Sequence, residues 1–359
     1  MIKSRPSLTM ICDLQFGSTG KGLLAGYLAK QQEPDAVATA WMPNAGHTFI
    51  DSDGTRYVHT MLANGVVSKS VEKVFIGPGS VINPQALSDE CMPFIADTSR
   101  ELEFFIHPNA VIVTDEHREA EKALVKIGST MKGSAEAVIQ KLRRDPNNMN
   151  TAAIRKSDFE LGAYVRSIEE YNNAIDSCKH IQIEGAQGFS LGVSNGFYPY
   201  TTSRECTPTQ ILTDCAIPYY RHSGPVVNGV WGTMRTFPIR VANRYDENGK
   251  QIGTSGPCYS DQFEIDWSSI GQEPELTTVT KLPRRIFTFS MQQMRQALRM
   301  TRCNFLFLNF VNYLPSETRT DFMRMINWIA HDYGCCINLI GFGPTVNDII
   351  ECSTDPEDA

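Results

Sequence analysis

Residues 12–22 read Cys-Asp-Leu-Gln-Phe-Gly-Ser-Thr-Gly-Lys-Gly, and this stretch decides the fold. The apolar run 8–12 precedes it, and residues 23–30 continue with the composition of a helix, so the order is strand, glycine-rich turn, helix. Backbone N–H groups of such a turn and the N-terminus of the next helix form a cradle for phosphate, to which Lys21 adds a full charge. The spacing G-x-x-G-K-G differs from the P-loop of nucleoside triphosphatases. We expect phosphate binding here; the alternative is an ordinary turn with an exposed lysine.

Composition excludes several broad classes of protein. The chain has 359 residues and a formal net charge of −7, which argues against a general nucleic-acid binder. Ten cysteines occur without a C-x-x-C pair, which favours buried free thiols in a reducing compartment over a metal site. Neither a signal-peptide pattern nor a membrane-spanning run is visible. We therefore expect a cytoplasmic protein that binds neither nucleic acid nor membrane.

Apolar runs alternate with helical patterns along the chain, and four of the runs end in glycine turns. The runs are residues 8–12, 74–76, 181–183 and 337–340. This order predicts an α/β fold with a mainly parallel central sheet flanked by helices. Ligands of such sheets bind beyond the carboxyl ends of the strands. We expect one catalytic domain over residues 1–352, with a polar surface excursion at 244–276 and a frayed acidic tail at 353–359.

Four further places combine residue types that suit an anionic ligand, and each has a plainer interpretation. His47 follows a glycine at a strand end and can act as an acid or electrophile, although a lone loop histidine is more often bland. Residues 127–133 place hydroxyls beside a lysine. This segment is either a second phosphate contact or a simple loop between helices. Gln187 in a glycine turn can read a base. Residues 277–285 hold three cations, which suit a carboxylate or phosphate, or form a solvated loop.

Eight segments, in the same order, resemble the adenylosuccinate synthetase family from residue 12 to about residue 346. They are Gln15–Gly22, Asn44–Thr48, Ile76–Gly79, Gly128–Thr130, Glu184–Gly188, Tyr198–Ser203, Thr278–Thr280 with Arg284 and Arg285, and Gly343–Pro344. The resemblance implies a P-loop-related fold and a ligase. Family members join aspartate to C6 of a purine 5′-monophosphate, using a nucleoside triphosphate and Mg²⁺ through a 6-phosphoryl intermediate.

The resemblance also implies roles for particular residues. The catalytic residues are Ser18, Lys21, His47 and Gln187, and the metal is held at Ser18 and Gly46. The triphosphate falls to Gly17, Thr19, Gly20, Lys21, Gly22, Gly46, His47, Thr48, Asn309, Asn312, Gly343 and Pro344. The purine monophosphate falls to Ser18, Asn44, Ser129, Thr130, Arg143, Arg144, Gln187, Thr202 and Val241. The aspartate falls to Thr278, Val279, Thr280, Arg284 and Arg285. One of the two arginines, Arg143 or Arg144, reaches across from the partner subunit of a homodimer.

Three departures from the family pattern bear on the substrates. Ser18 and Thr19 replace an Asp-Glu pair, so the family's base at purine N1 is lost and room appears where a 2-amino group projects. Asn309 and Asn312 stand in the strand whose aspartate selects guanine in the family, and an amide suits adenine instead. Leu282 aligns with an arginine near the ribose, which fits a substrate without a 2′-hydroxyl.

Together the departures resemble a bacteriophage-type branch of the family that condenses dGMP with L-aspartate for diaminopurine DNA. ATP or dATP is then the expected phosphoryl donor. Two alternatives remain open at this point. One is an ordinary family member that acts on IMP, and the other is a non-catalytic purine-nucleotide-binding protein that lost its base with the aspartate.

Overall fold

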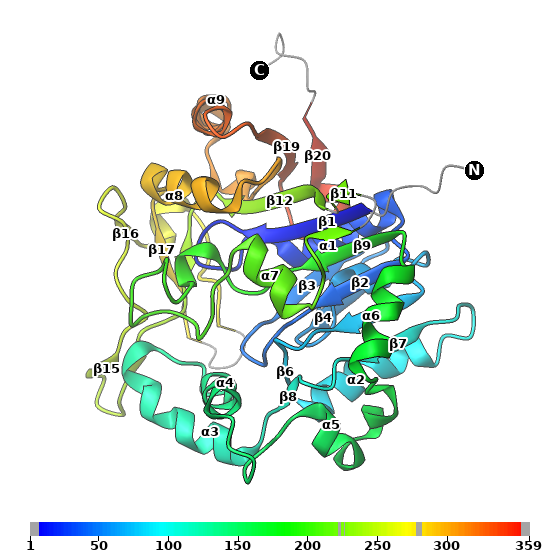
Figure 1. The fold of residues 1–359 in the computed structure, drawn as a ribbon. Coiled ribbons are helices and arrows are strands. Elements are labelled where there is room, and N and C mark those ends of the chain that lie inside the picture. Colours follow the sequence, from blue (N-terminus) through cyan, green and yellow to red (C-terminus); the bar gives the residue numbers. More distant parts are fainter. Residues whose placement is uncertain (1–6, 222–223, 226, 278–281, 353–359) are drawn as a thin grey trace, which may run out of the picture.

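A computed structural model describes residues 7–221, 224–225, 227–277 and 282–352. Its centre is a nine-stranded sheet in the order β20-β19-β18-β12-β1-β9-β2-β5-β7, shown in Figure 1. All neighbouring pairs are parallel except β19 with β20. The strands are β1 (Ser7–Asp13), β2 (Ala36–Thr39), β5 (Lys73–Ile76), β7 (Glu103–Ile106), β9 (His180–Glu184), β12 (Val227–Arg235), β18 (Phe305–Asn309), β19 (Cys336–Gly341) and β20 (Ile349–Glu351).

Burial on both faces explains why the central strands read as continuous apolar runs. In β1, for example, Leu8, Met10 and Cys12 pack into one apolar cluster, while Ile11 packs into another on the opposite face. Parallel strands joined by helical crossovers are covered on both sides, so alternation of polar and apolar residues is not required. The polar Asp13 at the end of β1 is therefore an exception that its site must explain.

Nine α-helices connect or flank the strands in the described part of the chain. Figure 1 shows the pair α8 and α9 near β19, and the pair α3 and α4 at the opposite end of the view. The helices are α1 (Lys21–Gln32), α2 (Pro84–Ile95), α3 (Asp115–Glu121), α4 (Ser134–Arg143), α5 (Ala152–Arg155), α6 (Ile168–Ser177), α7 (Pro208–Asp214), α8 (Met291–Thr301) and α9 (Ser316–His331).

Short ribbons lie beside the large sheet. They pair as β3 with β4, β6 with β8, β10 with β11, and β14 with β15, while β17 joins β13 to β16. Their bounds are β3 (His47–Ile50), β4 (Arg56–His59), β6 (Val81–Ile82), β8 (Val111–Ile112), β10 (Tyr220–Arg221), β11 (Gly224–Pro225), β13 (Ile239–Arg240), β14 (Arg244–Tyr245), β15 (Gln251–Gly253), β16 (Glu264–Ile265) and β17 (Arg285–Phe287).

The architecture confirms the predicted α/β class with a mainly parallel sheet. Segment 244–276, expected as a polar surface excursion, contributes β14, β15 and β16, and it also buries Tyr259 and Trp267 against the body of the protein. The predicted tail 353–359 and the predicted aspartate-binding residues Thr278, Val279 and Thr280 lie outside the described residues. No helix in the described ranges is long and apolar enough to cross a membrane.

Candidate active site

A cleft with a volume of about 1020 Å³ opens at the carboxyl ends of the central strands. Most of the predicted site residues line it: Gly17, Ser18, Thr19, Gly20, Lys21, Gly22, Asn44, Gly46, His47, Thr48, Thr130, Gln187, Val241, Arg284, Asn309, Asn312, Gly343 and Pro344. Its wall carries the cations Lys21, Arg56, Lys132, Arg244 and Arg284 against one carboxylate, Glu275. The cleft is therefore locally basic in a chain of net charge −7, which suits anionic substrates.

The glycine-rich loop keeps a backbone shape that few side chains tolerate. Gly17, Ser18 and Gly20 have φ angles of 90°, 58° and 94°. A Cβ on Gly20 would lie 2.2 Å from Asn309 Nδ2, so only glycine fits between this loop and β18. Ser18 is a non-glycine residue in the left-handed region, where backbone strain is concentrated at functional sites. Its side chain is exposed in the cleft wall.

Asp13 organises this loop from below. Its Oδ1 accepts from the N–H groups of Gln15 at 2.8 Å and Gly17 at 3.2 Å. Its Oδ2 accepts from the Thr19 hydroxyl and from Lys21 Nζ, the latter at 3.2 Å. The carboxylate and the lysine are both buried, and a buried pair of this kind holds its geometry because breaking it leaves an uncompensated charge.

Lys21 is directed into the cleft by two partners from different strands. Besides Asp13, its Nζ donates to the carbonyl of Gln187 at 2.7 Å. That carbonyl follows β9, so the lysine joins the ends of β1 and β9. Gln187 itself has a φ of 52°, a conformation that sets both its carbonyl and its side chain toward the cleft loops. Lys21 is buried, so the alternative of an exposed lysine on a simple turn does not hold.

His47 is the first residue of β3, and its orientation is fixed by Glu184 at the end of β9. Nδ1 of His47 lies 2.6 Å from Glu184 Oε1. Glu184 also accepts from the backbone N–H of Asn64 at 2.7 Å. Burial lowers the pKa of His47, and Glu184 partly opposes that shift. A neutral imidazole beside a carboxylate carries its proton on Nδ1, which leaves Nε2 as the nitrogen for a ligand in the cleft.

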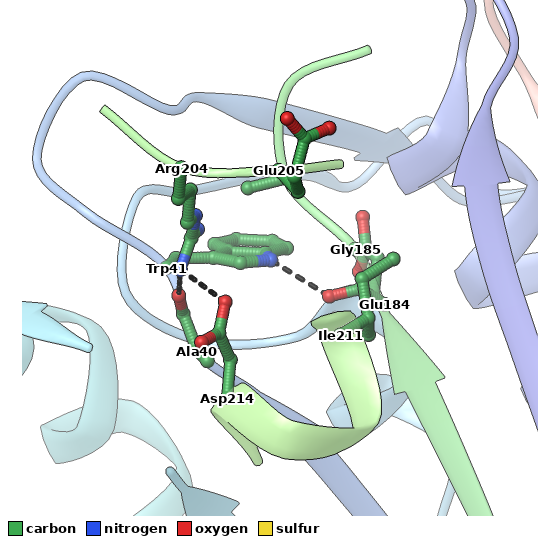
Figure 2. Close-up of a pocket in the computed structure, with 9 residues that line it drawn as sticks. Ala40, Trp41, Glu184, Gly185, Arg204, Glu205, Ile211 and Asp214 are labelled. Atoms are coloured by element: carbon green, nitrogen blue, oxygen red, sulfur yellow. Dashed lines mark hydrogen bonds and ion pairs between the residues drawn. The ribbon is translucent and has the colours of Figure 1, made fainter. Parts of the chain in front are cut away.

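Trp41 holds the other side of the His47 ring. The two ring centroids lie 4.1 Å apart, and the indole N–H donates to the Glu184 carbonyl at 2.8 Å. Figure 2 shows a small cavity of about 10 Å³ behind this tryptophan. There Arg204 donates to the carbonyl of Ala40 and pairs with Asp214 at 3.3 Å. The residues packed behind Trp41 thus fix the position of the indole ring against His47. His47 therefore has specific partners, unlike a loop histidine without a particular role.

Two of the predicted purine-binding side chains carry buried polar atoms without a protein partner. Gln187 Nε2 donates to Asn44 Oδ1 at 3.2 Å, but Gln187 Oε1 is buried and accepts from no described group. Thr202 Oγ1 is also buried and unpartnered among the described residues, although Thr202 is not one of the residues that line the cleft. Unsatisfied buried polar atoms are rare in native proteins, and a bound ligand is a common explanation for them.

Arg244 adds a half-buried cation to the cleft wall. It lines the cleft, donates from Nη2 to the carbonyl of Ser129 at 2.8 Å, and burial lowers its pKa. Ser129 does not line the cleft, and its hydroxyl donates to Glu121 at 2.6 Å. Thr130, the next residue, does line it, beside Lys132. Of the predicted hydroxyl pair at 129–130, the cleft therefore receives the threonine.

The two arginines predicted for aspartate binding lie in different surroundings. Arg284 lines the cleft, and burial lowers its pKa. Arg285 lies outside the cleft lining and pairs through two bonds, at 2.8 and 2.6 Å, with Glu264. The carbonyl of Leu282 accepts from the N–H of Thr277 at 2.8 Å. The structure thus favours Arg284 over Arg285 as a ligand contact.

Asn309 and Asn312 also differ in how accessible their side chains are to a ligand in the cleft. The Asn309 side chain is buried, donates to the carbonyl of Thr19 at 3.3 Å and accepts from the N–H of Phe310 at 2.8 Å. It therefore fastens β18 to the glycine loop. Asn312 is exposed in the cleft wall, on the side of Gly343 and Pro344. Asn312 is the better placed of the two to contact a base.

Arg143 and Arg144 lie at the end of α4, exposed and outside the cleft lining. The described part of the chain contains no acidic partner for either of them. The described residues also contain no cluster of three or more His, Cys, Asp or Glu side chains that could hold a metal by themselves.

Several residues of the site were missed by sequence reasoning. They are Asp13, Arg56, Glu184 as the partner of His47, Arg244, Glu275 and Phe310. For Asp13 a signal exists, because an acid at the end of an apolar strand that leads into a glycine loop is unusual. Arg244 and Glu275 lie in polar stretches of many charges, so their place in the cleft follows only from the fold.

Comparisons with known proteins agree with this geometry. The family description "Adenylosuccinate synthetase" matches residues 10–161 and 145–318. The chain is 46% identical to "N6-succino-2-amino-2'-deoxyadenylate synthase" of Salmonella phage PMBT28, over 97% of this chain and 98% of that protein.

Two solved structures share the fold over nearly the whole chain. One is succinoaminodeoxyadenylate synthetase (PurZ) of cyanophage S-2L, bound to dGMP and to dATP as an energy donor. It is 40% identical with a TM-score of 0.87, and the match covers 98% of this chain and 96% of that one. The other is fully ligated adenylosuccinate synthetase from Plasmodium falciparum, 18% identical with a TM-score of 0.76, over 96% and 99% of the two chains. At that identity, the second likeness concerns the fold alone.

Proposed function

Because the chain belongs to the adenylosuccinate synthetase family, we propose that it is a ligase that condenses dGMP with L-aspartate. The donor is dATP, with ATP as the alternative, and the product is N6-succino-2-amino-2′-deoxyadenylate. The observation that carries the acceptor is Ser18, exposed in the cleft wall at the position where the family has an aspartate. The name of the Salmonella phage relative gives the same product, and the cyanophage S-2L structure is bound to dGMP and dATP.

The reaction has two group transfers at C6 of the purine. The 6-oxygen of dGMP attacks the γ-phosphorus of the donor, and the bond from that phosphorus to the β-phosphate oxygen breaks. The aspartate amine then attacks C6, and the C6–oxygen bond breaks with release of phosphate. Such transfers depend chiefly on positioning and on neutralising charge. The chain's own residues supply both.

Lys21 and the Gly17–Gly22 loop hold the γ-phosphate. The loop's N–H groups face the cleft at the start of α1, whose N-terminus favours an anion. An arriving phosphate competes with the Gln187 carbonyl and Asp13 for Lys21 Nζ. A cation already oriented by two acceptors loses little conformational freedom when it turns to the phosphate.

His47 serves the oxygen that links phosphorus to the purine. Its pKa is lowered while the cleft holds no anion, so its Nε2 is unprotonated at neutral pH. Negative phosphate oxygens near Nε2 favour the imidazolium and raise that pKa. Glu184 stabilises the resulting cation through Nδ1, and Nε2–H can donate to the phosphoryl oxygen.

The site also fits Mg²⁺, which we propose as the cofactor. Mg²⁺ prefers oxygen ligands and is usually bound by one or two protein groups together with substrate phosphates. A Cβ built on Gly46 would meet no atom within 4 Å, so the space beside its carbonyl is open. The Gly46 carbonyl and the Ser18 hydroxyl line the same cleft and would hold the ion. When bound, it would neutralise charge on the transferring phosphate.

The remaining substrate contacts are assigned to three places. Gln187, Asn44 and Thr202 would bind the purine monophosphate, since Gln187 Oε1 and Thr202 Oγ1 are buried without described partners. Arg284 would take a carboxylate of aspartate. Asn312 would read the donor base.

A homodimer with an arginine in trans completes the proposal. Arg143 and Arg144 are exposed at the end of α4, and Leu142 of the same helix is 69% exposed. An apolar side chain beside unpaired cations suits an interface that delivers a cation to a partner's phosphate. Mixing Arg143→Ala/Arg144→Ala protein with His47→Ala protein tests this, because a hybrid dimer regains one complete site. Activity no higher than the sum of the two separate variants contradicts an arginine in trans.

The function is tested by offering dGMP and IMP separately with aspartate, Mg²⁺ and dATP. We expect a nucleotide with the mass of dGMP plus aspartate less water, formed together with one phosphate. The same assay with ATP compares the donors. Turnover of IMP but not of dGMP would mean an ordinary adenylosuccinate synthetase. A protein that binds these nucleotides but releases no phosphate from any combination would be a non-catalytic binding protein.

A further inference from the structure

Arg235 is a fully buried arginine at the carboxyl end of β12, and the reaction just described gives it no role. Its backbone is fixed by Gln15, which accepts from the N–H of Arg235 at 3.0 Å and donates to its carbonyl at 3.1 Å. The side chain therefore starts from a rigid strand end, directly behind the glycine loop.

The guanidinium bonds to two walls of the cleft at once. Nη1 donates to the carbonyl of Ser18 at 3.1 Å. Nη2 and Nη1 donate to the two carboxylate oxygens of Glu275 at 2.5 and 3.3 Å. Glu275 lines the cleft, two residues before Thr277 and the cationic segment. A planar fork is the geometry that only arginine offers to a carboxylate.

The ring of Phe310, in a third wall of the cleft, packs on the face of the same guanidinium. Arg235 Cζ lies 3.8 Å from the centre of the Phe310 ring, and Phe310 lines the cleft next to Asn312. Phe310 has a φ of 60°, and the hydroxyl of Thr236 donates to its carbonyl at 2.8 Å. Tyr313 completes the cluster, because its hydroxyl donates to Glu275 Oε1 at 3.3 Å. The turn after β18 is thus held in its place by β12.

We propose that Arg235 is a positioning residue that couples the binding of the two nucleotides. It contacts the residue that faces the acceptor purine, Ser18, through its carbonyl, and the turn that faces the donor base, Phe310, through its ring. A nucleotide that orders either wall therefore also orders the guanidinium and, through it, the other wall. The assignment of the two walls to acceptor and donor rests on the proposed function.

This coupling is a binding free energy and is measured as such. The affinity of the wild-type protein for dGMP is determined by titration calorimetry without and with saturating dATP, with both aspartate and Mg²⁺ left out so that no phosphoryl group is transferred. We expect dATP to tighten dGMP binding, and dGMP to tighten dATP binding by the same factor. In Arg235→Lys, which keeps the charge but loses the fork and the flat ring contact, we expect this factor to fall at least about fivefold.

A matched control comes from another arginine with the same three kinds of partner. Arg100 donates to the carbonyl of Ser68 at 2.7 Å, lies 3.9 Å from a carboxylate oxygen of Asp97, and stacks on Phe94 with Cζ 5.2 Å from the ring centre. It lies outside the cleft lining. Arg100→Lys is expected to lower the melting temperature somewhat and to leave the coupling factor unchanged.

Glu275→Gln gives a second measurement if Arg235→Lys folds poorly. It removes the charge of the carboxylate and leaves the Arg235–Phe310 contact in place, so the coupling factor should fall in the same direction by less. A coupling factor in folded Arg235→Lys or Glu275→Gln equal to that of the wild type overturns the proposal. Wild-type protein that binds both nucleotides without coupling overturns it as well, even if the ligase reaction proceeds. Coupled binding in a protein that fails to form the dGMP product would instead overturn the proposed function and leave the role of Arg235 supported.

Discussion

On one side of the cleft, here called the donor side, polar groups are satisfied by one another. Asp13 accepts from four groups of the glycine loop, Asn309 joins that loop to β18, and Lys21 has two acceptors. On the acceptor side, defined here as the groups assigned to the purine monophosphate, Gln187 Oε1 and Thr202 Oγ1 are buried without a partner among the described residues. The donor side is preorganised by internal bonds, whereas the acceptor side leaves hydrogen-bonding capacity to the substrate. Changes on the two sides should therefore have different signatures.

Removal of His47, which serves both sides, should have the largest effect. We expect His47→Ala to lower kcat on the order of 10³-fold, because the variant has no group to donate to the phosphoryl oxygen. The affinity for the donor nucleotide should change little, since the glycine loop and Lys21 remain. Steady-state kinetics with direct binding of dATP measures both quantities. Turnover at the wild-type rate would remove His47 from the mechanism.

The next effect concerns His59, which pairs with His47 across β3 and β4 and should make the protein less stable in acid. Burial lowers the pKa of His59 to about 4, whereas in the unfolded chain it stays near its ordinary 6.5. Between these values the unfolded state binds more protons, so the free energy of unfolding falls as the pH drops from 6.5 to 4, by up to about 3 kcal/mol. Above pH 6.5 this contribution does not vary.

Urea titrations at several pH values test this prediction. His59→Gln should flatten the pH dependence between 4 and 6.5, while His107, whose pKa burial also lowers to about 4, keeps its own share in both proteins. An unchanged slope in the variant would show that His59 protonates in the folded protein without penalty.

A substitution that breaks the internal bonds of the donor side should lower both the free energy of unfolding and kcat. Asp13→Asn leaves Lys21 without its buried counter-charge and should lower the free energy of unfolding by about 3 kcal/mol. The displaced loop should also reduce kcat by about 10²-fold, because phosphoryl transfer is sensitive to small shifts of position. Denaturant titration and kinetics are measured on the same preparation. Loss of stability with an unchanged kcat would mean that Asp13 supports the fold and not the loop geometry.

The opposite signature is expected at Thr202. Thr202→Val keeps the shape of the side chain and removes a hydroxyl whose oxygen has no described partner. Stability should stay the same or rise slightly, while the affinity for dGMP should fall about tenfold. A melting curve and a dGMP titration give the two values. A clear loss of stability would place the threonine among the internally bonded groups, against the comparison.

The sequence predicted the sheet and much of the donor side because both depend on local pattern. The glycines and Lys21 are adjacent in the chain, and the strand before them is continuously apolar, so strand, turn and helix could be read directly. His47 and Gln187 were found because each stands in a glycine-containing turn of the family resemblance. Their partners were not, since Glu184 and Trp41 meet His47 only when β2, β3 and β9 are assembled.

The sequence also did not predict which individual polar side chains face the cleft and which are bonded within the protein. Asn309 and Asn312 are equivalent by pattern, yet the fold buries the first against Thr19 and exposes the second. Likewise Arg284 and Arg285 are neighbours, yet Arg284, just before β17, lines the cleft, whereas Arg285, the first residue of β17, pairs with Glu264 of β16. Such choices depend on packing between distant segments.

The most direct test of the central claim is a competition between dGMP and IMP at equal concentration, with aspartate, Mg²⁺ and dATP. The ratio of the two succinyl products gives the ratio of kcat/KM values without a separate calibration of each substrate. For the wild type we expect the 2-amino product to dominate. For Ser18→Asp we expect its share to fall by at least about tenfold, because the carboxylate occupies the space of the 2-amino group. A wild-type protein that forms the IMP product in preference, or a ratio that Ser18→Asp leaves unchanged, would contradict the account.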